Sequence, residues 1–412
     1  MTPRARAWLT AGVWGAVAIV AVAFGVQRYA AAAGDPQPDL GGFFLPAATA
    51  ILGGQSPYTV TGYFYSPLVA LLLAPFASSD AAIPAWTVMR IAAGIAACVV
   101  AAFACTPRGN LLRTGLLALL ALVTLLWSVP TTLDLWAGQV ELIVLLTLVI
   151  AALAETRGWK FTAGFMLGLG AVVKTWPALF TVWLLRAGWR ARARQWAGVA
   201  VAALVAIALA VLTGGFGAVA DMIRAPFTGA EQPLLAANSV WGLPRVLFSD
   251  TPMAEPLIES SALRIVTTVL LVVWVVALGV VALVRPGPPV ISLFNVTFLV
   301  ILLLPVSHYF YVIYALPALW WWAGRLIERP RSAITWVALT VLALWWIAVF
   351  RIAPAGDGFM TTTWPSLLRI FGACLIAVTV SVACAAIMHR REVSGSNISL
   401  PAGVSKPGSS PA

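Results

Sequence analysis

The chain has 412 residues, of which 61% are hydrophobic and only 9% are charged, and its net charge is +11. A soluble domain averages about 25% charged residues, so this composition excludes an ordinary soluble protein. It predicts an all-α integral membrane protein whose single helical domain covers residues 1–392. The four cysteines lie in or beside apolar runs without metal or redox spacing, so we expect no metal site and no cofactor there. They are Cys98, Cys105, Cys374 and Cys384.

The basic residues are distributed unevenly along the chain. Seventeen of the 25 Lys and Arg fall in seven short segments that hold only three acidic residues. Basic residues gather in the cytoplasmic loops of membrane proteins, so we expect these segments, and with them both termini, to be cytosolic. The net charge therefore indicates topology, and we expect no nucleic-acid partner. The segments begin at Arg4, Arg108, Arg157, Arg186, Arg285, Arg325 and Arg390.

The first apolar run, residues 8–29, is longer than the hydrophobic part of a signal peptide. We therefore expect an uncleaved helix that crosses outward. Residues 30–80 then form an outer loop that carries short helices and a re-entrant segment, and residues 83–104 cross back. An odd number of crossings is needed between Asp39 and Arg108, and a span over residues 64–78 stays open as an alternative.

Later apolar runs predict the rest of the bundle, about twelve spans in all. Residues 161–186 leave and re-enter within 26 residues, which indicates two half-length helices. Residues 214–262 form a second outer loop. Residues 393–412 are rich in Ser, Gly and Pro, which predicts a disordered cytosolic tail in which the sequon at Asn397 stays unglycosylated. The other crossings are expected at 111–127, 136–154, 195–213, 263–284, 289–306, 309–323, 333–352 and 366–388.

Two aspartates follow the first helix, where charge is otherwise scarce. Asp35 stands between Gly34 and Pro36 and is expected in a turn. Asp39 lies about ten residues beyond the helix, near the outer interface, where a carboxylate costs less than at the bilayer centre. It is a solvated loop residue, a helix N-cap, or a functional carboxylate.

Polar groups recur at the outer ends of later elements. Gln139 and Glu141 begin an apolar helix, and Gly138 before them allows close backbone approach. Lys174 stands between two half-helices, and His308 stands at an outer turn beside several tyrosines. Singly these are snorkelling or aromatic-belt residues. Together they predict a polar, water-accessible pocket, since ionisable groups within membrane segments are usually functional.

Four stretches carry a family resemblance. They are PDLGGFFLPAATAILGGQSPY with FYSPLVALLLAPF, WAGQVELIVLLTLVIAALAE, GWKFTAGFMLGLGAVVKTWPALFTVWLL, and NSVWGLPRVLF. In this order they resemble the polytopic GT-C glycosyltransferases of the DUF2029 group, glycosyltransferase family 87, over about residues 8–388. Glu141 stands where the family often has Asn, and His308 is single where many relatives have a pair of histidines.

The resemblance implies a GT-C-type bundle and a substrate class. The donor would be a polyprenyl-phosphate-linked sugar, and the acceptor a lipid-linked sugar or cell-envelope glycan at the outer face of a bacterial plasma membrane. Mannose is the preferred sugar, transferred with inversion, and arabinofuranose is the alternative. The sequence has no DxD-like pair, so no metal is indicated.

The resemblance also implies roles for individual residues. Asp39 would be the general base for the acceptor hydroxyl. Lys174, with His308 or Arg245, would supply countercharge to the leaving phosphate. The remaining substrate-binding residues, of which the first two would hold sugar hydroxyls, are Gln139, Glu141, Tyr65 and Tyr309.

Two other classes of function remain open. A lipid or sugar transporter suits the half-helices and the charges within the membrane. The absence of an internal repeat and the position of the polar residues at one face weigh against it. A non-catalytic scaffold leaves Lys174 and Glu141 unexplained.

Overall fold

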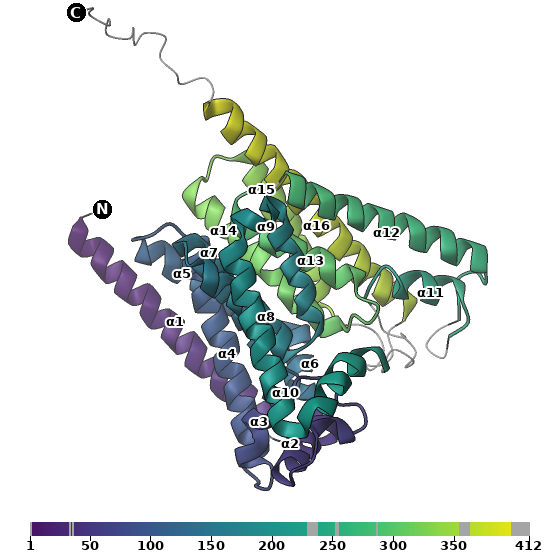
Figure 1. Ribbon diagram of the computed structural model, residues 1–412. Helices are drawn as coiled ribbons and strands as arrows, with labels where there is room; N and C mark the ends of the chain where they lie inside the picture. The colour runs from purple at the N-terminus through teal and green to yellow at the C-terminus, as the bar shows by residue number, and fades with distance from the viewer. Residues whose placement is uncertain are drawn as a thin grey trace, which may run out of the picture.

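The computed structural model describes residues 2–32, 34, 37–228, 238–251, 255–285, 287–353 and 363–396. Over these residues the regular secondary structure is entirely helical, which confirms the predicted all-α class. The beginning of α1 (Pro3–Ala32) and the end of α16 (Trp364–Ser396) lie at the same end of the bundle in Figure 1. Asp35 and the tail from Asn397 onward lie outside the described residues.

Six of the described helices are long and apolar enough to cross a membrane, so the chain is a multi-pass membrane protein. A seventh span results if α5 (Leu111–Leu126) and α6 (Val129–Ala137), bent by 64°, are taken together. The expected count of about twelve is not confirmed, because several expected crossings are shorter or broken helices. The six are α1, α4 (Ala82–Cys105), α10 (Ala193–Thr228), α12 (Ser261–Val284), α15 (Ala333–Trp346) continued by η7 (Ile347–Arg351), and α16.

Short helices occupy the segment after α1. Ser66 accepts a hydrogen bond from the backbone N–H of Leu68 at 3.3 Å, so Ser66 and Pro67 give α3 a well-defined start. Helices α3 and η3 together have only ten residues. At about 1.5–2 Å per residue their combined length is well short of the roughly 30 Å hydrocarbon core. The alternative span over 64–78 is therefore too short as a helix. The elements are η1 (Leu40–Phe44), α2 (Leu45–Leu52), η2 (Pro57–Thr59), α3 (Pro67–Leu73) and η3 (Ala74–Phe76).

Three later helices are broken at the end of the bundle where the short helices after α1 lie. Gly138 ends α6 in the left-handed conformation (φ +83°), and α7 (Glu141–Arg157) begins three residues later. Lys174 ends α8 (Lys160–Val173), and the 3₁₀ helix η4 (Trp176–Ala187) follows, which gives the two half-length segments expected over 161–186. Helix α10 is kinked at Gly214 and Gly215.

The helices differ in how much of their surface the protein itself covers. Helices α7 and α13 are buried over most of their length, whereas only 11% of the most apolar 18-residue stretch of α12 is buried. Since α12 is apolar all round, its exposed side chains face lipid. The remaining helices are α9 (Gly188–Ala191), α11 (Gly242–Phe248), α13 (Pro289–Leu303), η6 (Tyr309–Ala315) and α14 (Leu316–Glu328).

Candidate active site

Asp39 lies immediately before η1 but does not cap it with its side chain. Its Oδ2 instead accepts a short hydrogen bond from Nε2 of Gln139, one hundred residues further along the chain. Only 8% of Asp39 is exposed. The N-cap alternative is therefore wrong, and the carboxylate belongs to a long-range polar contact.

Gly138 makes this contact possible. A Cβ at this position would lie 2.9 Å from Cβ of Leu40 and 3.2 Å from Cβ of Gln37. The left-handed φ of Gly138 is also one that other residues adopt at a cost. The predicted close backbone approach at Gly138 is thus present. It lets the α6–α7 turn lie against the start of η1, which brings Gln139 to Asp39.

Gln139 is the centre of the cluster. Its Oε1 accepts hydrogen bonds from the Tyr65 hydroxyl at 2.7 Å and from Nζ of Lys174 at 3.2 Å. Both donors fix the amide so that its Nε2 points at Asp39. Four of the residues expected from the sequence are therefore connected here: Asp39, Gln139, Lys174 and Tyr65.

Lys174 reaches the cluster because it leaves helix α8 in an extended conformation (φ −145°, ψ 130°). Its Nζ lies 2.5 Å from Oε1 of Glu141, in a buried ion pair. The ammonium also lies 4.5 Å from the ring centre of Tyr311 and 5.3 Å from that of Tyr65, which is cation–π range. The ring centre of Phe310 lies 5.9 Å away, so one carboxylate and three aromatic rings surround the charge of Lys174.

Burial sets the proton affinity of Asp39. Loss of solvation raises the pKa of its carboxyl above the ordinary value, and the charge of Glu141 adds to this rise. The hydrogen bond from Gln139 and the charge of Lys174 act in the opposite direction. A carboxylate with a raised pKa is a stronger base than an exposed aspartate, which suits proton abstraction.

The α13–η6 turn supplies an aromatic wall. His308 stacks on Phe310 at 5.2 Å between ring centres, and its ring meets that of Tyr311 edge-on at 5.4 Å. Desolvation, and after it the charge of Lys174, lowers the pKa of His308 below its ordinary value. His308 is therefore neutral at pH 7, and any help it gives to a phosphate is as a hydrogen-bond donor.

Two of the residues expected in the site lie elsewhere. The Tyr309 hydroxyl donates to the backbone carbonyl of Val349, so it faces η7, and Tyr311 is the tyrosine of η6 that meets Lys174. Arg245 lies on α11 and lines a separate hollow beside α12. The sequence YFYVIY by itself does not indicate which of Tyr309 and Tyr311 faces Lys174.

The buried hydrogen bonds of Arg90 and Gln37, close to Asp39 in the chain fold, were not predicted from the sequence. Arg90 is fully buried in α4, and its Nη2 donates to Oε1 of Gln37 at 2.9 Å. Its Nη1 donates to the backbone carbonyls of Asp134 at 3.0 Å and Leu135 at 3.2 Å. Gln37 has an unusual positive φ of 41° and donates to Thr87 at 2.8 Å. The one feature of the sequence that indicates this role is that Arg90 is the single charged residue in the apolar run 82–105.

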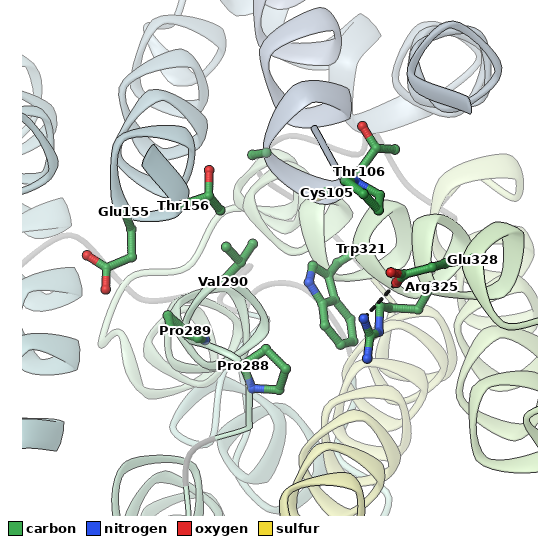
Figure 2. A pocket seen from close by; sticks show the side chains of 12 residues that line it. Cys105, Thr106, Glu155, Thr156, Pro288, Pro289, Val290, Trp321, Arg325 and Glu328 are labelled. Carbon is green, nitrogen blue, oxygen red and sulfur yellow. Dashed lines mark hydrogen bonds and ion pairs between the residues drawn. The ribbon is translucent and has the colours of Figure 1, made fainter. Parts of the chain in front are cut away.

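The cluster is more enclosed than the predicted water-accessible pocket. Glu141 is inaccessible, and Gln139 and Lys174 are 7% and 6% exposed. A hollow of about 490 Å³ lies instead at the other end of α7, where Glu155 and Trp321 contribute to its lining (Figure 2). Glu141 and Glu155 are 14 residues apart on one helix, or about 21 Å along its axis. This hollow is therefore not part of the Asp39 cluster.

A multi-pass membrane protein that keeps a carboxylate, an amide and an ammonium group in one enclosed cluster has the groups needed to move a proton and to bind an anion. Glycosyltransferase family 87 matches residues 63–305, more than half of the chain. The chain belongs to this family and is a glycosyltransferase. The matched range includes Gln139, Glu141 and Lys174. His308 lies three residues after its end, and Asp39 lies 24 residues before its start.

A curated relative matches over a longer stretch. The chain is 26% identical over 315 residues to the polyprenol-phosphate-mannose-dependent α-(1-2)-phosphatidylinositol mannoside mannosyltransferase of Mycobacterium tuberculosis. The alignment covers 74% of this chain and 69% of that protein.

Proposed function

We propose that this protein transfers a sugar from a polyprenyl-phosphate donor to a hydroxyl of a lipid-linked acceptor or cell-envelope glycan. The observation that carries the proposal is the enclosed contact of Asp39 with Gln139, which also binds Lys174. Gln139 thus joins a carboxylate that could act as a base to an ammonium group that could stabilise a phosphate. Family membership and the polyprenol-phosphate-mannose dependence of the relative support the donor class.

In the proposed reaction Asp39 is the general base. The acceptor hydroxyl gives its proton to the Asp39 carboxylate while its oxygen attacks the anomeric carbon of the donor. The bond between that carbon and the phosphate oxygen breaks, and its electron pair leaves with the polyprenyl phosphate. A single displacement of this kind inverts the anomeric configuration. A positioned base contributes about 10²–10⁴-fold to such a step.

Lys174 is proposed to stabilise the charge that develops on the leaving phosphate. Its ion pair with Glu141 lowers the cost of keeping an ammonium group buried and fixes its position. This geometry favours a positioning role for Glu141, acting through Lys174. Direct contact of Glu141 with sugar hydroxyls stays a prediction, as does that of Gln139. Tyr65 would orient the Gln139 amide through its hydroxyl.

We propose mannose as the sugar, on the strength of the relative's donor, and a phosphatidylinositol mannoside as the first acceptor to test. The proposed orientation places the cluster at the outer face of a bacterial plasma membrane, with both termini in the cytosol. The distribution of arginine among the loops supports this orientation.

The test is transfer by the purified protein. It is incubated with radiolabelled polyprenyl-phosphate mannose and a phosphatidylinositol mannoside, beside the Asp39→Asn variant. We expect labelled product from the wild type and at least a hundredfold less from the variant. Transfer only from a decaprenyl-phosphate arabinofuranose donor would replace mannose and keep the base. No transfer from either donor, together with counterflow of sugar or lipid in liposomes, would favour a transporter.

A further inference from the structure

A second hollow, of about 360 Å³, lies between α11 and α12, where the two helices pack against each other. It is separate from the Asp39 cluster and shares none of its residues. Figure 1 shows α11 beside the beginning of α12, at the edge of the bundle. The hollow is lined by Trp241, Arg245, Arg264, Ile265, Thr268 and Val269.

Two arginines give this hollow its charge. Arg245 projects from α11 and Arg264 from the first turn of α12, and no carboxylate is among the described residues of the lining. Nη1 of Arg264 donates to the Ser249 hydroxyl at 3.2 Å, which leaves its positive charge uncompensated. The acidic residues of the adjoining loop, Asp250, Glu255 and Glu259, are exposed and do not line the hollow. Neither guanidinium has a carboxylate partner among the described residues. Two such groups favour an anion with several acceptor oxygens.

The polarity of the hollow changes along α12. Arg264 belongs to the first turn of the helix, whereas Thr268 and Val269 lie about 6 Å further along its axis. A positively charged end is thus followed by a mainly apolar wall. This order matches an amphiphile whose charged head lies near the helix start and whose chain runs along the helix.

The hollow opens toward lipid. Helix α12 is apolar and its surface is almost entirely uncovered, with Ile265 and Val269 each more than half exposed. Trp241 is fixed on the other side by a hydrogen bond from its Nε1 to the backbone carbonyl of Leu303 at 2.8 Å. Trp and Arg are the residues that proteins place at the level of lipid headgroups.

We propose that this hollow binds an anionic phospholipid of the surrounding bilayer, with its phosphate between Arg245 and Arg264 and an acyl chain along Ile265 and Val269. The occupant is a bilayer phospholipid, because a sugar donor that reacts at Asp39 must place its own phosphate near Lys174. Lipid binding in this hollow is separate from sugar transfer, although the exclusion of the sugar donor as its occupant rests on the proposed function. It assigns Arg245 to lipid binding at the periphery of the protein.

The experiment measures lipid retention by the full-length protein. Wild type and variants are reconstituted in nanodiscs of phosphatidylglycerol and phosphatidylcholine, extracted with mild detergent, and analysed by native mass spectrometry for bound lipid. The variants are Arg245→Gln and Arg264→Gln. Arg224→Gln is the matched control, because Arg224 is an exposed arginine of α10 that does not line the hollow. Elution volume and helical circular dichroism establish that each variant is folded.

We expect the wild type and Arg224→Gln to retain phosphatidylglycerol over phosphatidylcholine. Each hollow variant should lower that preference about fivefold, the effect of one basic residue on binding an anionic lipid. An unchanged preference in both hollow variants overturns the proposal. Complete displacement of phosphatidylglycerol by equimolar polyprenyl phosphate makes the hollow a substrate site and also overturns it, as does displacement by inorganic phosphate. None of these readouts requires sugar transfer.

Discussion

Nζ of Lys174 lies 2.5 Å from Oε1 of Glu141, and the protein encloses both side chains almost completely. Glu141 is the first residue of α7, and Lys174 is the residue that ends α8. The pair therefore joins the two helices at the end of the bundle that holds Asp39. A buried pair of this kind is costly to break from one side, since the remaining charge has no solvent to stabilise it.

Removing one partner of this pair should destabilise the protein strongly. We expect Glu141→Gln or Lys174→Met to lower the free energy of unfolding by about 3–5 kcal/mol, because each leaves a buried group unpaired. The double variant should recover most of this stability and still lack transfer, because it has no cation for the leaving phosphate. Chemical unfolding in mixed micelles, followed by helical circular dichroism, gives the energies.

The control for this pair is Glu328→Gln, which removes the partner of Arg325 in a more exposed ion pair. Its effect should stay within about 1 kcal/mol. A double variant no more stable than either single variant would show that Lys174 and Glu141 are not energetically coupled.

Asp39→Asn should remove the base and keep the contact. The new amide oxygen still accepts from Gln139, so we expect unchanged folding and a loss of transfer of about 10²–10⁴-fold in kcat. Asp80→Asn, an exposed aspartate on the same segment, is the matched control and should transfer normally. Near-normal transfer by Asp39→Asn would exclude Asp39 as the base.

The pH dependence of transfer should report the Asp39 carboxyl. Transfer requires the deprotonated base, so kcat/KM should fall as pH drops through the pKa of Asp39, which burial raises above its ordinary value. Gln139→Leu removes a hydrogen bond that stabilises the carboxylate. The acidic limb should therefore move to higher pH in this variant.

Tyr65→Phe is the comparison for that experiment, because it leaves the bond between Gln139 and Asp39 intact. Its acidic limb should move less than that of Gln139→Leu. A limb that stays in place in Gln139→Leu, or moves to lower pH, contradicts the assignment of this limb to Asp39.

Gly138→Ala should separate crowding from backbone strain. Gly158 has a similar positive φ (+78°) but open space around it, so Gly158→Ala measures the backbone cost, about 1–2 kcal/mol. Gly138→Ala adds a clash with Leu40, worth about a further 1–3 kcal/mol, and should also lower transfer by displacing Gln139. Equal effects of the two substitutions on unfolding and transfer would show that the close approach at Gly138 is unimportant.

Arg90 is expected to act on the reaction through Gln37 and the α6 backbone. Arg90→Leu removes the hydrogen bonds that Arg90 donates to three buried acceptors, so we expect lower stability together with lower kcat. Arg90→Lys keeps the charge but not the forked geometry and should restore only part of both. Full activity and stability in Arg90→Leu would assign no positioning role to this arginine.

The amino-acid sequence determined the class of this protein. Apolar runs long enough to cross a bilayer require helices, since backbone polar groups in lipid must bond within their own segment. Glycine, proline and polar residues marked the breaks at Gly138 and Lys174. The expectation that Asp39, Gln139 and Lys174 belong together came from their shared position at one end of the helices and from the family resemblance.

Tertiary structure decided what each side chain contacts. Contacts between residues a hundred positions apart depend on how helices pack, and periodicity within one helix carries no record of that packing. The fold paired Glu141 with Lys174, turned Tyr309 toward Val349 and brought Tyr311 to Lys174 instead. It also placed Arg90 beneath the site and moved Arg245 out of it, because α4 packs inside the bundle whereas α11 lies at its edge beside lipid-facing α12.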